Sequence, residues 1–174
     1  MENNENMEAR IKWVKENLYS KYHPFEVKNE NGKLVIYGDV LIPYMLEELE
    51  YKIDEVHGNI STDNVVDQFI NGNLKSLKNF PDIVYGDCIV RMNSGLTTLE
   101  NSPKRINGDF NCSNCGLTNV KGMPKYIAGN FIAYNNNISD LTQINENYII
   151  GMIDMEFNPC ENEVIKFTAK NKSL

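Results

Sequence analysis

Histidine and tryptophan are nearly missing from this chain, whose 174 residues include two histidines and one tryptophan. His23 and His57 stand in no pattern of neighbouring nucleophiles or metal ligands, so histidine-dependent acid–base catalysis has little to use. The chain also lacks the G-x-S-x-G, phosphate-loop and H-E-x-x-H motifs of common catalytic sites. The sequence therefore predicts a protein that is not an enzyme and needs no cofactor.

Long apolar runs are absent as well, and none approaches the roughly 20 residues that a membrane-spanning helix needs. The polar start, MENNENMEAR, has no basic region followed by an apolar one, so it does not resemble a secretory signal. Four cysteines without such a signal are typical of free thiols in a reducing compartment. We expect a cytoplasmic protein that does not contact membranes.

Basic residues are outnumbered by acidic ones, 17 against 24, which gives a formal net charge of −7. Direct binding of DNA or RNA needs clustered lysine and arginine, so the composition argues against a nucleic-acid-binding protein. The acidity either serves solubility or forms a negative face for a protein partner with a basic surface.

A repeat of about 21 residues runs along the chain. Glycines recur in similar settings at positions 86, 108, 129 and 151, in steps of 22, 21 and 22 residues, and positions 38 and 58 extend the pattern upstream. Pairs of apolar residues three apart lie between these glycines, and some are followed by proline. The pairs are Leu46 and Leu49, Leu74 and Leu77, Leu96 and Leu99, Leu117 and Val120, and Ile138 and Leu141, and the prolines are Pro81, Pro103 and Pro124.

Each unit predicts one short strand and a tight return. After the glycine, apolar residues alternate with other residues, as in Phe110 and Cys112, which is the periodicity of a strand with one buried face. Proline in the return argues against a long helix there. A single unit cannot bury its own apolar residues, whereas stacked units share a continuous core. The sequence predicts an α+β solenoid of about six units with a stacked sheet of strands.

Three stretches resemble the core of a leucine-rich repeat: FNCSNCGL from Phe110, FIAYNNNI from Phe131 and IDMEFNPC from Ile153. Units of this kind are similar to those of short leucine-rich-repeat-like proteins of tailed bacteriophages and mobile elements. The resemblance covers residues 34–160, with an insertion at residues 61–73, and it implies an interaction module.

The Cys112-x-x-Cys115 motif has two interpretations. A zinc site would need two more ligands at suitable spacing, which the sequence does not offer. Within the repeat, Cys112 takes an inward position shared with Ala133, and Cys115 takes a turn position shared with Asn136. The resemblance implies that Asn at this turn bonds loop backbone groups and that Cys can replace it. We expect no metal and no disulfide, and mostly buried thiols.

The two ends of the repeat region predict caps. Residues 4–22 have the apolar spacing of a helix, and Asn31-Gly32 marks a hairpin turn. We expect residues 1–33 to cap the solenoid of residues 34–160, and residues 161–174 to form a short capping helix at its other end. Residues 46–56 also have helical spacing and predict a helix in the first unit.

Strand alternation places one set of residues on the outer face of the predicted sheet, where a partner would bind. Exposed isoleucine and tyrosine are plausible anchors of such an interface. A weaker candidate is Phe69 of the insertion, which either packs back on the repeats or projects as a recognition element. The outward residues are Ile89, Arg91, Asn111, Ser113, Ile132, Tyr134, Asp154 and Glu156.

These patterns predict a protein–protein interaction module of undefined oligomeric state. The resemblance implies a phage-encoded protein that binds and inhibits a host protein, such as a defence nuclease, in the host cytoplasm. One alternative is a structural or assembly role in the phage particle. Another is an enzyme with a carboxylate site, since stacking would bring Asp87 and Asp109 together.

Overall fold

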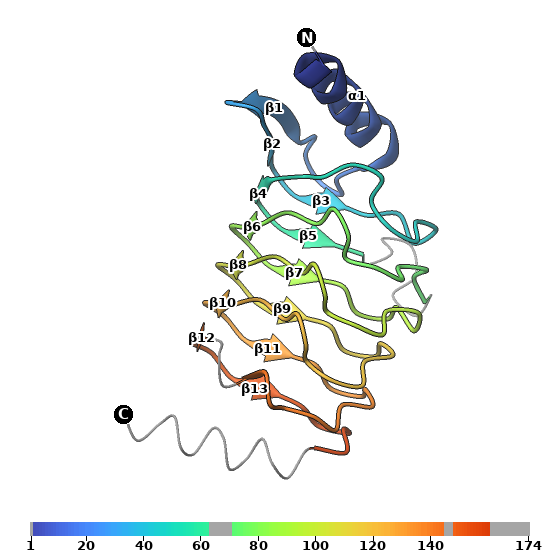
Figure 1. Ribbon diagram of the computed structural model, residues 1–174, viewed down its shortest axis with the longest axis vertical. Helices are drawn as coiled ribbons and strands as arrows, with labels where there is room; N and C mark the ends of the chain where they lie inside the picture. Colours follow the sequence, from blue (N-terminus) through green and yellow to red (C-terminus); the bar gives the residue numbers. More distant parts are fainter. Residues whose placement is uncertain (1, 63–70, 145–147, 161–174) are drawn as a thin grey trace.

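A computed structural model describes residues 2–62, 71–144 and 148–160, which form a β-solenoid of about five stacked turns of about 22 residues (Figure 1). Helix α1 (Glu2–Asn17) comes first, followed by a hairpin of β1 (Glu26–Glu30) and β2 (Lys33–Tyr37). The later strands are short. They are β3 (Val40–Leu41), β4 (Glu55–His57), β5 (Ile60–Ser61), β6 (Ile83–Val84), β7 (Cys88–Ile89), β8 (Arg105–Ile106), β9 (Phe110–Asn111), β10 (Tyr126–Ile127), β11 (Phe131–Ile132), β12 (Tyr148–Ile149) and β13 (Ile153–Asp154).

The strands form two sheets along the long axis, whereas the sequence predicts one. The first, which we call sheet I, has the order β1-β2-β4-β6-β8-β10-β12, and the second, sheet II, has the order β13-β11-β9-β7-β5-β3. Sheet II is the predicted sheet, whose strands follow the repeated glycines. Apart from the hairpin strand β1, sheet I consists of the residues just before those glycines, so each glycine stands at the corner between the two sheets. Six corners bound five complete turns, which explains why about six units were predicted.

Inward side chains form apolar columns that run from turn to turn. Phe110 and Phe131 of sheet II stack with their ring centroids 5.9 Å apart. Because each turn lays an apolar side chain on that of its neighbour, all turns share one core. The fully buried columns include Ile36, Val56, Val84, Ile106 and Ile127 from sheet I, Ile60, Cys88, Phe110 and Phe131 from sheet II, and Leu49, Leu77, Leu99 and Val120 from the third, strand-free side.

Helix α1 packs on the first turn and buries Met7 and Val14 in the common core, and Leu18, which directly follows the helix, is buried there too. The helix was predicted to reach residue 22, but it ends at Asn17. Tyr19 instead exchanges backbone hydrogen bonds with Leu41 of β3, so tertiary pairing takes the backbone away from a further helical turn. Within the described ranges, no helix is long and apolar enough to cross a membrane.

The predicted hairpin is confirmed. Strands β1 and β2 pair antiparallel, with Glu30 opposite Lys33. Asn31 and Gly32 both have positive φ, 55° and 85°, as a two-residue hairpin turn with right-handed strand twist requires. The hairpin adds the outermost strand to sheet I beyond the first turn of the solenoid.

The predicted helix at residues 46–56 is wrong, because this stretch lies extended along the third side and ends in β4. Its backbone bonds to the next turn, with Lys75 N–H donating to Glu47 O at 2.8 Å and Ile53 N–H donating to Asn79 O at 3.1 Å. Burial of one residue in three at solenoid corners imitates helical spacing in the sequence. The predicted C-terminal helix at residues 161–174 lies outside the described residues.

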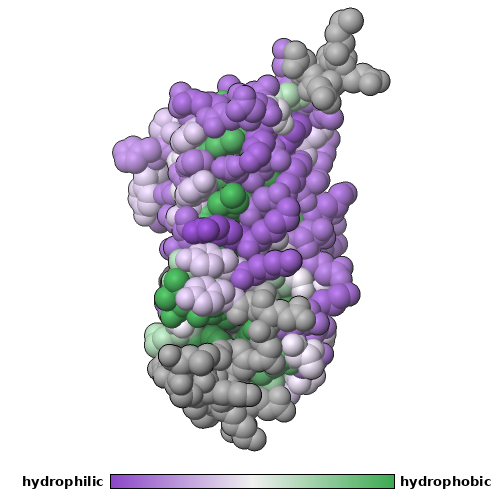
Figure 2. Space-filling view, turned by 60° about the vertical axis from the view of Figure 1, so that its left-hand side comes forward, coloured by the Kyte–Doolittle hydropathy of each residue, from purple (hydrophilic) through white to green (hydrophobic). Residues whose placement is uncertain are grey.

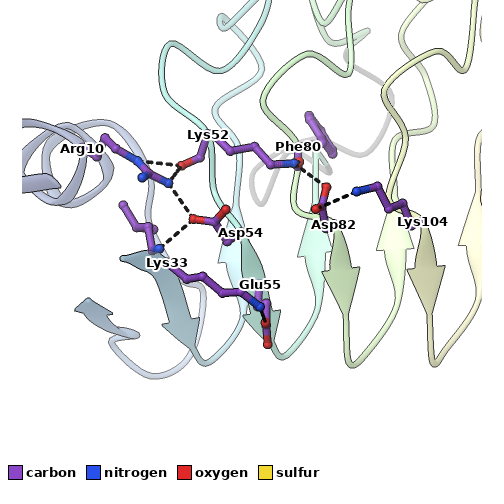
Figure 3. A network of polar contacts seen from close by, with 9 residues as sticks. Arg10, Lys33, Lys52, Asp54, Glu55, Phe80, Asp82 and Lys104 are labelled. Atoms are coloured by element: carbon purple, nitrogen blue, oxygen red, sulfur yellow. Dashed lines mark hydrogen bonds and ion pairs between the residues drawn. The ribbon is translucent and has the colours of Figure 1, made fainter. Parts of the chain in front are cut away.

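Polar contacts join α1 to the first turn (Figure 3). The Arg10 guanidinium donates to the Lys52 carbonyl and, at 2.7 Å, to Asp54 Oδ2. The same Asp54 oxygen accepts the N–H of Leu34 at 2.7 Å. One carboxylate therefore fixes both the helix and the start of β2.

The polar contacts continue across the next two turns (Figure 3). Lys52 Nζ donates to the Phe80 carbonyl and, at 2.8 Å, to Asp82, and Lys104 Nζ reaches the other Asp82 oxygen at 3.0 Å. Partial burial raises the pKa of Asp82, but the hydrogen bonds from Lys52 and Lys104 outweigh it and hold the pKa below its ordinary value.

Close approach of the turns explains the repeated glycine. The N–H of Gly108 donates to Gly86 O at 3.0 Å, and Gly129 donates to Gly108 O at 2.9 Å. A Cβ atom added to Gly108 would lie 2.8 Å from the carbonyl group of Gly86, where neighbouring backbone cannot yield cheaply. At Gly108 the close approach therefore excludes a side chain without a positive φ, whereas Gly38 at the first corner has φ 121° as well.

We expect Gly108→Ala to lower the free energy of unfolding by about 1–3 kcal/mol, the usual range for overpacking. Gly95→Ala is the matched control, because the nearest atom to its added Cβ belongs to the flexible Lys75 side chain, at 3.0 Å, and the nearest backbone atom lies at an ordinary contact distance of 3.8 Å. Chemical denaturation of both variants tests this, and equal stability of the two would contradict the steric role of the corner.

Asp82→Asn should lower stability at pH 7 by less than about 1 kcal/mol, since the ion pairs are partly exposed and screened. The depressed pKa of Asp82 stabilises the fold above the unfolded-state carboxyl pKa of about 4, and this contribution is lost as pH falls through the folded value. The difference in melting temperature between the two proteins should therefore narrow below about pH 4. A difference in melting temperature that stays constant from pH 7 to pH 3 would show that the ionised Asp82 carboxylate does not stabilise the fold.

Candidate functional site

The outward residues predicted from strand alternation lie together on sheet II. Ile89, Asn111, Ile132 and Asp154 occupy one column in strand register. The second column holds Arg91, Ser113, Tyr134 and Glu156, two residues further along each turn. Backbone bonds hold the turns together there too, with Asn114 N–H donating to Tyr134 O at 3.1 Å. The eight residues thus share one side of the solenoid.

Their accessibility differs, and one prediction about it is wrong. Ser113 is fully buried rather than exposed. Asn111 Oδ1 accepts both the backbone N–H and, at 2.6 Å, the hydroxyl of Ser113, so this side chain turns back onto its own strand. Ser113 therefore offers a partner no contact. Of the others, Glu156 is exposed and the remaining six are half-buried. Phe69, the weaker candidate, lies outside the described residues.

A column of asparagines at the far end of sheet II closes the corner to the third side. Asn136 is buried, and its Oδ1 accepts the N–H groups of Cys115 and Leu117 at 3.1 and 3.2 Å. Its Nδ2 donates to the carbonyls of Cys112 and Ala133, both at 3.0 Å. Asn136 therefore satisfies backbone groups of two turns at once, the role expected from the sequence.

Cys115 replaces asparagine in this column and makes part of the same pattern. Its thiol donates to Val90 O at 3.3 Å, as Asn136 does to the corresponding carbonyl of the turn before. A thiol has no amide oxygen, so the N–H of Leu96 bonds instead to Asn93 O of its own turn at 2.9 Å. The extra residue between Asn93 and Leu96 makes that bond possible, so the two irregularities compensate each other.

The cysteines have the character of core residues. Cys88, Cys112, Cys115 and Cys160 are all free. Burial raises the pKa of the Cys88 and Cys112 thiols far above the ordinary value, and it raises the pKa of Cys115 to about 11. Thiols with a raised pKa are poor nucleophiles and poor metal ligands at neutral pH. Among the described residues, no three His, Cys, Asp or Glu side chains gather as a metal site.

Asp87 and Asp109, the pair behind the carboxylate-enzyme alternative, act on the backbone. Asp87 Oδ1 accepts the N–H of Asp109 at 2.8 Å, and Asp109 Oδ1 accepts the N–H of Asn130 at 2.7 Å. Asn59 does the same for Asp87 at 2.7 Å. A neutral amide serves as well as a carboxylate, so the ladder needs an oxygen acceptor and no charge.

A second outer surface, on sheet I, was missed from the sequence. Ile83, Arg105, Tyr126 and Tyr148 pair in register along it. The Arg105 guanidinium carbon lies 4.5 Å from the centre of the Tyr126 ring, and Tyr126 stacks on Tyr148 with centroids 5.7 Å apart. These four residues each stand three positions before a repeated glycine, so the glycine period could have revealed them. They were missed because no strand was predicted before the glycines.

Figure 2 brings sheet I forward and shows apolar side chains gathering towards the C-terminal end. Tyr148, Ile150 and Met152 have exposed fractions of 63%, 57% and 73%. Towards the N-terminal end, Tyr37, His57 and Tyr85 stack on one another, with centroids 4.5 and 4.1 Å apart. Sheet I therefore presents rings packed against each other along the solenoid axis.

We expect iodoacetamide at pH 8 to leave Cys88, Cys112 and Cys115 unmodified in the native protein, because their raised pKa values keep the thiols protonated. Intact mass should show four additions after unfolding in reductant. As pH rises towards 11, Cys115 should react before Cys88 and Cys112. Rapid labelling of Cys115 at pH 8, or one equivalent of zinc by elemental analysis, would contradict a purely structural role.

Comparison of the chain with protein-family models, with curated proteins and with solved structures finds no match.

Proposed function

We propose that this chain is a non-enzymatic protein-binding module that uses the outer side of sheet II. The main observation behind this proposal is the pair Ile132 and Tyr134. Both side chains are half-buried, Ile132 in β11 and Tyr134 just after it, and neighbouring turns of the solenoid lie on both sides of β11. A tyrosine beside an aliphatic side chain, surrounded by polar groups, is a common centre of protein interfaces.

The support under this surface is rigid. Neighbouring turns lie about 4.8 Å apart, and Ile132 O accepts the N–H of Cys112 at 2.8 Å while Ala133 N–H donates to Asp154 O at 2.8 Å. A backbone bonded on both sides loses little freedom on binding, so less of the interaction energy is spent on ordering it.

The charged residues in the two outward columns of sheet II suggest which end of the surface a partner contacts. Arg91 stands towards the N-terminal end, whereas Asp154 and Glu156 stand at the C-terminal end. By contrast, Glu47 and Glu48 on the third side already pair with Lys75 and Lys78. A partner with a basic surface is therefore proposed to meet the Asp154 and Glu156 end of sheet II.

The resemblance to leucine-rich-repeat-like proteins of tailed phages extends this proposal. The chain would then be a phage-encoded protein that binds and inhibits a host protein in the host cytoplasm, such as a defence nuclease. An acidic protein is suited to cover a basic nucleic-acid groove. The repeat units quoted above support this extension, together with the net charge of −7.

Ile132→Asp combined with Tyr134→Ala should abolish capture of the partner from host lysate by the immobilised protein, because it removes both central side chains of the surface. Mass spectrometry identifies what the unmodified chain retains. The fold should survive, since both side chains are only half-buried.

The matched control is Tyr44→Ala combined with Met45→Asp, two exposed residues of the first turn. Capture that persists in the sheet II variant and falls in the control would place the binding site elsewhere. Recovery of phage particle proteins alone would favour the assembly role over inhibition.

A further inference from the structure

Arg105 on sheet I is held in place while its binding groups stay free. Its guanidinium carbon lies over the Tyr126 ring, 4.5 Å from the ring centre, and its Nε donates to Asn107 Oδ1 at 2.8 Å. Within the described part of the chain, no carboxylate pairs with its terminal nitrogens. A guanidinium fixed by stacking presents two parallel donors, the arrangement that binds a carboxylate most tightly.

Two lysines add to the positive charge beside Arg105. Lys104 and Lys125 lie on successive turns, since Lys125 N–H donates to Lys104 O at 3.1 Å. Lys104 reaches Asp82, a carboxylate that it shares with Lys52, and Lys125 has no carboxylate partner among the described residues. This part of the surface is therefore cationic on a chain whose net charge is −7.

Apolar groups continue the same surface towards the last turn. Tyr148 extends the stack of Arg105 and Tyr126, and Ile150 and Met152 follow it with exposed fractions of 57% and 73%. A fitting ligand therefore has negative charge at one end and an apolar group at the other.

Peptide fits this surface better than nucleic acid. Bases bind proteins by stacking on free aromatic faces, but Arg105 covers one face of Tyr126 and Tyr148 stacks on the ring as well. A nucleic-acid backbone also needs a continuing row of cations. The column instead leads to Ile83 and then to Glu55, which is paired with Lys33.

We propose that Lys104, Arg105, Lys125, Tyr126 and Tyr148, which we call the arginine–tyrosine strip, bind an acidic peptide segment of a protein partner. The carboxylates of the segment meet Arg105 and Lys125, and an apolar side chain that follows them packs on Ile150 and Met152. The strip is separate from the sheet II surface, so this proposal and the proposed function stand or fall independently.

The test uses a fluorescein-labelled peptide with a run of glutamates followed by leucine and phenylalanine. Fluorescence anisotropy with the full chain should show saturable binding that weakens as salt is added. Arg105→Ala combined with Lys125→Ala should weaken binding about tenfold or more, the scale expected for lost charge-assisted hydrogen bonds. Arg105→Lys should also weaken binding, because lysine keeps the charge and loses the fork.

The matched control is Lys78→Ala combined with Lys121→Ala, which removes the same charge from exposed side chains that pair with Glu48 and Glu100. It should leave the affinity within about twofold. The Ile132→Asp with Tyr134→Ala variant should bind the peptide normally, which separates this surface from sheet II.

Three results would overturn the proposal. The unmodified chain could fail to bind the peptide at low salt, or the control could lose as much affinity as the strip variant. Tighter binding of oligothymidylate than of the acidic peptide would assign the strip to nucleic acid instead. Circular dichroism of every variant shows whether a loss of binding reflects a loss of the fold.

Discussion

The spacing of about 4.8 Å between hydrogen-bonded turns is the constraint on which the whole molecule depends. Glycine is required where that spacing brings backbone against backbone, as at Gly86 and Gly108. The same spacing lets Asp87 reach the amide of the next turn and lets Asn136 bond two turns at once. Among the described residues, no buried side-chain nitrogen or oxygen lacks a partner. The glycines, the polar acceptors and the asparagines at the corners are therefore all consequences of the same spacing between turns.

The sequence predicts the solenoid because glycine, leucine and proline recur at one period. The glycines recur because the turns approach closely, and the leucines recur because each turn buries them in the shared core. The sequence does not predict sheet I, because its short strands each bury at most one side chain, such as Ile106 in β8 or Ile127 in β10, whereas the turns of sheet II bury alternating pairs such as Phe110 and Cys112. It misplaces a helix at residues 46–56, since one buried residue in three occurs both in helices and at solenoid corners. The end of α1 depends on pairing between Tyr19 and Leu41, which sequence spacing does not reveal.

The candidate surfaces were predictable to a similar extent. Alternation finds the sheet II columns because Ile132 and Tyr134 alternate along the chain with the buried residues Phe131 and Ala133. It fails at Ser113, where a local bond to Asn111 overrides the outward direction. The arginine–tyrosine strip depends on contacts between residues one full turn apart, such as Arg105 and Tyr126, and these become visible only when the turns are placed in register.

The acceptor ladder at the glycine corner has a consequence for how such a chain can vary. Asp39, Asn59, Asp87, Asp109 and Asn130 all hold the next turn through one side-chain oxygen. Exchanging Asp and Asn at these positions changes the charge and keeps the bond. Three of the five are aspartates, so this one edge supplies three negative charges to a chain with a net charge of −7. Substitutions along this edge can therefore change the electrostatic repulsion between copies of the protein, and with it their solubility, while the packing of the turns stays the same.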